Sequence, residues 1–103
     1  MDIIVTGKHV EITDAIRDYA RSKVQKLPRY YDRVAEIEVL ITKPDNHEFE
    51  VEIIAHVDHH DNFVARHRHQ DLYGCIDDVT DKMTRQLKDH KERLRNRKHQ
   101  AHQ

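Results

Sequence analysis

Apolar and polar residues alternate along several stretches of this chain, and a period of two predicts β-strands. The clearest stretch is 49–57, where every second residue is apolar and most positions between are glutamate or histidine. The stretch 36–41 shows the same alternation over a shorter length. Residues 3–6 and 63–69 predict two further strands, and Gly7 is expected to end the first.

Apolar residues at helical spacing predict two helices. The first is expected to begin after Thr13, whose hydroxyl suits an N-cap, and to end before Pro28. The second is expected to run from about Asp71, with an apolar stripe that reaches Leu94. The segment 95–103 consists almost entirely of charged, amide and histidine side chains, so it is expected to fray.

The resulting order, β-α-β-β-β-α, predicts an α+β fold in which two helices pack on one face of a four-stranded sheet. The first β-α-β unit is expected to be a right-handed crossover between parallel strands, and hairpins join the rest. Residues 1–94 would form a single domain, followed by a basic, His- and Gln-rich flexible tail at 95–103. The uncovered sheet face is expected to be acidic. It would carry Glu36, Glu38, Glu50 and Glu52.

The bulk properties are those of one small soluble domain of 103 residues. The single cysteine, Cys75, excludes an internal disulfide and is expected to be a small buried hydrophobe in a reducing compartment. There is no signal-peptide pattern and no apolar run of membrane-spanning length. We therefore expect a cytoplasmic protein that does not enter a membrane.

A net charge of −1 hides a strong separation of charge along the chain. Residues 82–103 hold eight Lys/Arg against two acids, whereas residues 31–64 hold two Lys/Arg against nine acids. Cations on exposed helix faces usually serve only solubility. A surface made for solubility has no reason to sort its charges by side, so this pattern indicates a basic face for a polyanion.

Basic residues on both predicted helices could form that face. On the second helix, Lys82, Arg85, Lys88 and Lys91 recur every three residues. On the first helix, basic residues flank both sides of the apolar stripe, and they are Arg17, Arg21, Lys23 and Lys26. If the helices lie side by side, these side chains border one surface that can neutralise several phosphates.

Sequence-specific reading of bases is not favoured by the aromatic content. The chain has no tryptophan and few aromatic residues; Tyr19 lies in a core stripe, and Tyr30, Tyr31 and Tyr73 are the candidates for exposed rings. An acidic open sheet face would repel RNA, which argues against an RRM-type platform. Recognition of backbone and shape from the helix side fits better.

Ten histidines raise the alternative of a metal-binding protein. Adventitious binding is conceivable at a cluster of four, namely His59, His60, His67 and His69. Zinc-type Cys/His spacing is missing, so no resident metal or other cofactor is expected. No nucleophile elbow, phosphate loop or clustered carboxylate pair is present either, and the chain is not expected to be an enzyme.

Ordered blocks over residues 1–94 resemble the ribosome hibernation-promoting factor family. The blocks of the first half are Val10-Glu11-Ile12-Thr13, Ala15-Ile16-Arg17, Lys26-Leu27 and Tyr31-Asp32-Arg33. Those of the second half are Asp71-Leu72-Tyr73, Ile76-Asp77, Asp81-Lys82-Met83, Arg85-Gln86-Leu87 and His90-Lys91. The family's fold, similar to double-stranded RNA-binding domains, agrees with the predicted element order.

The resemblance implies a stress- or stationary-phase factor that binds the decoding channel of the small ribosomal subunit, blocks mRNA and tRNA, and silences translation. It carries contacts with 16S rRNA onto five residues, Arg17, Lys26, Lys82, Arg85 and Lys91. Helical phase adds three more, Lys23, Lys88 and Arg93. The protein would be a monomer off the ribosome.

The short basic tail is similar to that of the family's short form, which acts with ribosome modulation factor to pair idle ribosomes into dimers. A protein-Y-type inhibitor (ribosome-associated inhibitor A) that holds single ribosomes inactive is an alternative within the family. Outside it, the basic face would also suit a general double-stranded RNA-binding module.

Overall fold

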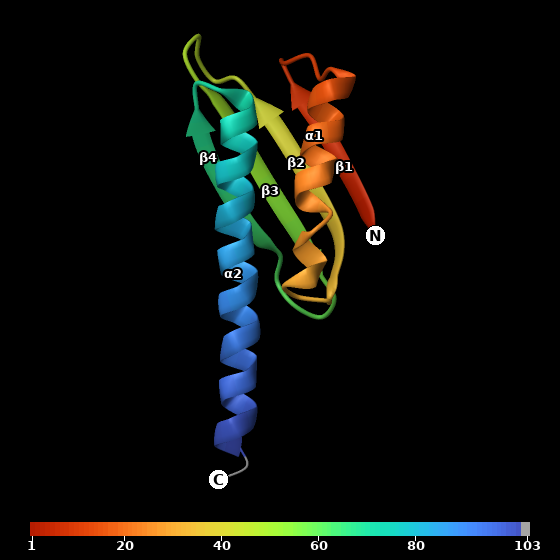
Figure 1. Ribbon diagram of the computed structural model, residues 1–103, viewed down its shortest axis with the longest axis vertical. Helices are drawn as coiled ribbons and strands as arrows, with labels where there is room; N and C mark the ends of the chain where they lie inside the picture. Colours follow the sequence, from red (N-terminus) through yellow and green to blue (C-terminus); the bar gives the residue numbers. More distant parts are fainter. Residues whose placement is uncertain (102–103) are drawn as a thin grey trace.

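Four strands and two helices make up the fold in the computed structural model, which describes the backbone of residues 1–101 and the side chains of residues 1–97. The elements are β1 (Asp2–Lys8), α1 (Asp14–Val24), the 3-10 turn η1 (Leu27–Arg29), β2 (Val34–Thr42), β3 (Phe49–Val57), β4 (Phe63–His69) and α2 (Leu72–Ala101). The sheet order is β1-β2-β3-β4, with β1 parallel to β2 and the other pairs antiparallel. Both helices lie on one face of the sheet (Figure 1). The predicted α+β fold is confirmed.

A β-bulge near the start of β2 sets which side chains face the helices. Val34 pairs with Val57, yet Glu36 pairs with the adjacent His56, so Ala35 is an extra residue in β2. Residues two apart in a regular strand share a face. Because of the bulge, Val34 is instead buried under the helices while Glu36 lies on the open face.

The core forms between the sheet and the helices. Its largest fully buried side chains are Leu27, Ile37, Ile41, Ile53, Ile76, Met83 and Leu87. Tyr31, one of the three tyrosines that were candidates for exposed rings, instead belongs to this core, at 7% exposed. Cys75 is buried as predicted, and burial raises the pKa of its thiol to about 11, so the thiol is not a thiolate at neutral pH.

Gly7 lies inside β1, because the strand continues to Lys8 and does not end at the glycine as expected. A Cβ at this position would lie 2.4 Å from the Val10 carbonyl oxygen and 2.6 Å from the Ile12 side chain. The glycine is therefore required by the close approach of the loop that leads into α1. In that loop Thr13 is the N-cap, as predicted, and its hydroxyl accepts from the Ile16 amide.

Helix α2 is much longer than the sheet it covers and runs past the sheet's end (Figure 1). Its 30 residues correspond to about 45 Å, and the molecule is 55 Å in its longest dimension. Its backbone is helical to Ala101, past Leu94, where the sequence predicted the start of the tail. Arginine and lysine are good helix formers, and cations are favoured at a helix C-terminus. The division into a domain 1–94 and a flexible tail stays a prediction, and residues 102–103 lie outside the described part.

Neither helix of the described chain is both long and apolar enough to cross a membrane.

Candidate nucleic-acid interface

Four basic residues wind around α2 from one side of the helix to the other. Lys82, Arg85, Lys88 and Lys91 are all exposed and stand three residues apart. Each step of three residues places the next side chain about 60° back around the helix axis. The four side chains therefore do not form a straight line but curve across the outer surface of α2.

Contacts of two residues in this series, Lys82 and Lys88, show which elements lie beside it. The Lys82 ammonium donates to the Arg66 carbonyl at 3.0 Å, so it lies against the edge strand β4. The Lys88 ammonium is 5.7 Å from the centre of the Tyr30 ring, so it lies toward η1. Lys26, which is exposed, precedes η1 and brings a further charge to that side. The predicted basic residues are therefore exposed on different sides of α2, from β4 round to η1.

A groove opens where α2 leaves the sheet, and we call it the end groove. Its walls come from the segment before β2, the turn between β3 and β4, and the last part of α2. Five of the lining residues are Lys or Arg and two are Asp, so the groove is basic even with its histidines neutral. The basic residues are Arg33, Lys91, Arg93, Arg95 and Arg97, and the acids are Asp32 and Asp58.

An aromatic cluster forms the floor of the end groove. The His90 ring lies 4.6 Å from His60, 5.1 Å from Phe63 and 5.0 Å from Tyr31, measured between ring centres. Burial lowers the pKa of His90, and the positive potentials of His60, Arg93 and Arg97 lower it further. His90 is thus a neutral packing residue at the base of a basic groove.

The two predicted contacts on α1 lie apart from this surface. Lys23 pairs with Asp77 of α2 at 3.2 Å, and the Tyr19 hydroxyl donates to the same carboxylate. The hydrogen bond from Tyr19 is the main reason that the pKa of Asp77 is lowered, so Asp77 stays charged and offsets Lys23. Arg17 donates to the Val5 carbonyl at 3.1 Å and lies toward β1, the edge away from α2.

The structure places Lys88, Lys91 and Arg93 around the end groove and the neighbouring hollow beside η1. Lys26, Lys82 and Arg85 are exposed outside these two hollows, and Arg17 and Lys23 are held by the contacts just described. Sequence reasoning did not assign a role to four arginines that line the end groove or the neighbouring hollow beside η1. They are Arg29, Arg33, Arg95 and Arg97. The last two were visible as part of the basic run but were assigned to a tail.

The open sheet face is less acidic than the sequence indicated. Arg66 and Arg68 of β4 reach across to Glu52 and Glu50, at 2.7 Å and 3.4 Å. These residues are register partners, so they share the open face. The glutamates alone made this face look acidic, because the arginines of β4 become their partners only when the strands pair.

The four histidines considered for adventitious metal binding do not form one cluster. His59 and His60 lie in the turn before β4, whereas His67 and His69 lie at its far end. Strand geometry puts about 20 Å between the two ends. His67 pairs with Asp78 of α2, and His59 has a φ of 60°, which gives it a turn role.

Comparison with known proteins gives a consistent set of relatives. Residues 3–95 match the family model described as "Sigma 54 modulation protein / S30EA ribosomal protein". The ribosome hibernation promoting factor of Azotobacter vinelandii is 36% identical over 93 residues, which cover 90% of this chain and 85% of that protein. The protein of the same name from Escherichia coli K12 is 35% identical over 101 residues, covering 92% of this chain and 98% of that protein.

Two solved structures are similar in fold. A ribosomal subunit interface protein from Coxiella burnetii superposes with a TM-score of 0.81 at 22% identity, covering 89% of this chain and 99% of that one. The N-terminal domain of Thermus thermophilus Protein Y superposes with a TM-score of 0.72 at 30% identity, covering 86% and 94%. The first likeness supports the fold alone.

Proposed function

Because this chain belongs to the Sigma 54 modulation protein / S30EA ribosomal protein family, we propose that it is a ribosome hibernation factor that silences translation in stationary phase or stress. Its relatives in A. vinelandii and E. coli carry the name ribosome hibernation promoting factor. It binds 16S rRNA in the decoding channel of the small subunit and excludes mRNA and tRNA. The action is by occupancy and needs no catalysis, and it takes place in the cytoplasm.

The observation that carries this proposal is the series of exposed basic residues along α2, which leads to the basic end groove. Lys82, Arg85 and Lys88 are exposed, and Lys91 and Arg93 extend the charge into the groove. Each phosphate that such a surface neutralises releases counterions and adds to a salt-dependent affinity. The surface would recognise the phosphate backbone and the shape of the RNA. Its aromatic rings pack against one another and are therefore not free to stack on bases.

Co-sedimentation with purified small subunits over a salt series tests the proposal. We expect saturable binding that tRNA and mRNA displace, because they occupy the same channel. The logarithm of the affinity should fall with the logarithm of salt concentration by roughly 0.7–0.9 per phosphate contacted. Equal affinity for any RNA duplex would instead identify a general double-stranded RNA-binding module.

Charge reversal locates the interface. The triple variant Lys82→Glu, Arg85→Glu, Lys91→Glu should release the protein from ribosomes and leave its circular dichroism unchanged. The matched control Glu50→Gln, Glu52→Gln alters charge on the open face and should keep full affinity. Retained binding by the triple variant, or a large loss in the control, would place the interface elsewhere.

Within the family, we propose the dimer-promoting role, in cooperation with ribosome modulation factor. Both hibernation promoting factors described above align along most of their own length with this chain. The likeness to Protein Y supports the second candidate, an inhibitor that holds single ribosomes inactive. Sucrose gradients of stationary cells with and without the gene separate the two. Loss of ribosome dimers on deletion supports the first, and a gain of dimers supports the second.

A further inference from the structure

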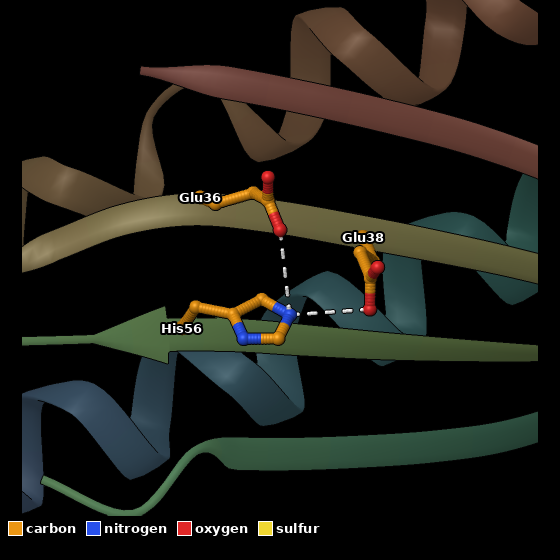
Figure 2. A group of neighbouring side chains, drawn as sticks. All are labelled: Glu36, Glu38 and His56. Atoms are coloured by element: carbon orange, nitrogen blue, oxygen red, sulfur yellow. Dashed lines mark hydrogen bonds and ion pairs between the residues drawn. The ribbon is translucent and has the colours of Figure 1, made fainter.

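The open face of the sheet brings two glutamates and a histidine together, away from the basic surface. Glu36 and Glu38 extend from β2, His56 extends from β3, and one ring nitrogen of His56 points toward both carboxylates (Figure 2). One potential ligand atom from each side chain lies within 4.8 Å of the others. We propose that this triad binds a divalent transition-metal cation of the Zn²⁺ class.

Backbone register, and not chance contact of flexible side chains, assembles the triad. Glu36 and His56 are direct cross-strand partners, and Glu38 is two residues along β2 on the same face. The regular pairing of β2 with β3 begins at Glu36, just after the bulge at Ala35, so Glu36, Glu38 and His56 all lie within the undisturbed part of the ladder. A site held by two paired strands keeps its donor atoms in place better than one on a loop.

Two of the three distances between donor atoms are close to those of a metal coordination shell, and the third is within 4.8 Å. His56 Nε2 lies 3.1 Å from Glu38 Oε2 and 3.6 Å from Glu36 Oε2. Ligands at about 2.0–2.1 Å from a tetrahedral Zn²⁺ are separated from each other by roughly 3.3 Å. A cation among the three atoms would therefore need only small side-chain rotations. The side chains of the triad are 33–40% exposed, so a cation can enter and one coordination position stays open to water.

Charge on this part of the face also favours a cation. Asp2 of β1 is the register partner of Glu36, so a third carboxylate lies in the same row. Arg66 and Arg68 are held by Glu52 and Glu50 farther along the sheet. Among residues 1–97, His56 is the only group that forms an ion pair with Glu36 or Glu38. A neutral imidazole leaves this row with a net negative charge.

The donor set selects the class of cation. One imidazole nitrogen and two carboxylate oxygens suit Zn²⁺ and its first-row neighbours, whereas Mg²⁺ and Ca²⁺ prefer all-oxygen shells. Binding requires the His56 tautomer with its proton on Nδ1, so that the Nε2 lone pair faces the carboxylates. The competing occupant is a proton on Nε2, which would make His56 a hydrogen-bond donor to Glu38. Zn²⁺ and this proton therefore exclude each other.

Titration of the full chain with ZnCl₂, followed by residue-resolved NMR, tests the site. At a pH where imidazole is neutral, the first saturable shifts should appear at the His56 ring and at the amides of Glu36 and Glu38. The affinity should fall as the solution is acidified, because protons displace the metal. First shifts at His67, His69 or the end-groove histidines, with His56 unaffected, would overturn the proposal.

Matched variants separate the triad from the other histidines. His56→Ala and the nearly isosteric Glu38→Gln should each lose at least tenfold in Zn²⁺ affinity, and circular dichroism checks their fold. His67→Ala removes an imidazole from the opposite sheet face, where it pairs with Asp78, and should keep the affinity. Unchanged affinity in both triad variants would show that the metal binds elsewhere. None of these changes touches the basic surface, so ribosome co-sedimentation is expected to be unaffected, and the metal site and the proposed function can fail separately.

Discussion

The two sides of the sheet carry their charges differently. On the open face, charged side chains meet across neighbouring strands: Arg66 contacts Glu52 and Arg68 contacts Glu50. On the helix side, Arg85 and Lys91 are exposed along α2 and continue the charge into the end groove. The net charge of a segment is thus a weaker guide to a binding surface than whether each charged side chain has an oppositely charged partner nearby.

The largest difference between the two sides is expected in how much stability is lost when an apolar side chain is truncated. Leu87 of α2 is fully buried against the sheet, whereas Val64 on the open face is 43% exposed. Leu87→Ala should lower the free energy of unfolding by about 2–5 kcal/mol, because it removes buried methyl groups and leaves a cavity. Val64→Ala should change it by less than about 0.5 kcal/mol. Urea denaturation of both variants measures the contrast, and similar losses would mean that the open face is covered in solution.

The sequence predicted the sheet and the helices because their periodicities are strong. In β3 the buried Val51, Ile53 and Ala55 alternate with half-buried polar or apolar neighbours, and the structure keeps this alternation. The parallel pairing of β1 with β2 followed from the intervening α1. These features depend on local pattern and on a few rules of chain connection.

What the sequence did not predict depends on partners distant in the chain. The pairing of Arg17 with the Val5 carbonyl and of Lys23 with Asp77 is set by how α1 docks, which no local pattern encodes. The end groove joins three separate segments, so the roles of Arg29 and Arg33 were not foreseen. The bulge at Ala35 was also missed, because 34–37 carries no glycine or proline to mark it.

A smaller loss of unfolding free energy is expected when the hydrogen bond between Tyr19 of α1 and Asp77 of α2 is removed. The Tyr19 hydroxyl donates to the charged Asp77, which also pairs with Lys23. Tyr19→Phe should lower the free energy of unfolding by about 1–2 kcal/mol, because the charged Asp77 carboxylate loses one of its hydrogen-bond partners. Arg66→Ala breaks an ion pair on the open face, where the Arg66 side chain is 60% exposed, and should cost only about 0.2–1 kcal/mol. Thermal unfolding followed by circular dichroism ranks the two, and a larger loss for Arg66→Ala would reverse the comparison.

The smallest effect at neutral pH is expected at His90, where the helix side becomes sensitive to acid. The pKa of His90 is lowered from 6.5 by burial and by the nearby His60, Arg93 and Arg97. The unfolded chain therefore binds a proton at this residue more readily than the folded one, and stability is lost as pH falls from above 6.5 toward the lowered value. Asp32 and Asp58 also line this groove, and their negative charges oppose the trend.

His90→Phe keeps an aromatic ring against Tyr31 and Phe63 but removes the titration, so it should match the wild type at pH 7.5 and lose less stability by pH 5.5. Because the remaining nine histidines are common to both proteins, the difference between the two urea-denaturation series isolates His90. Equal losses of unfolding free energy in the two series would show that the folded groove accommodates the charged His90 without cost.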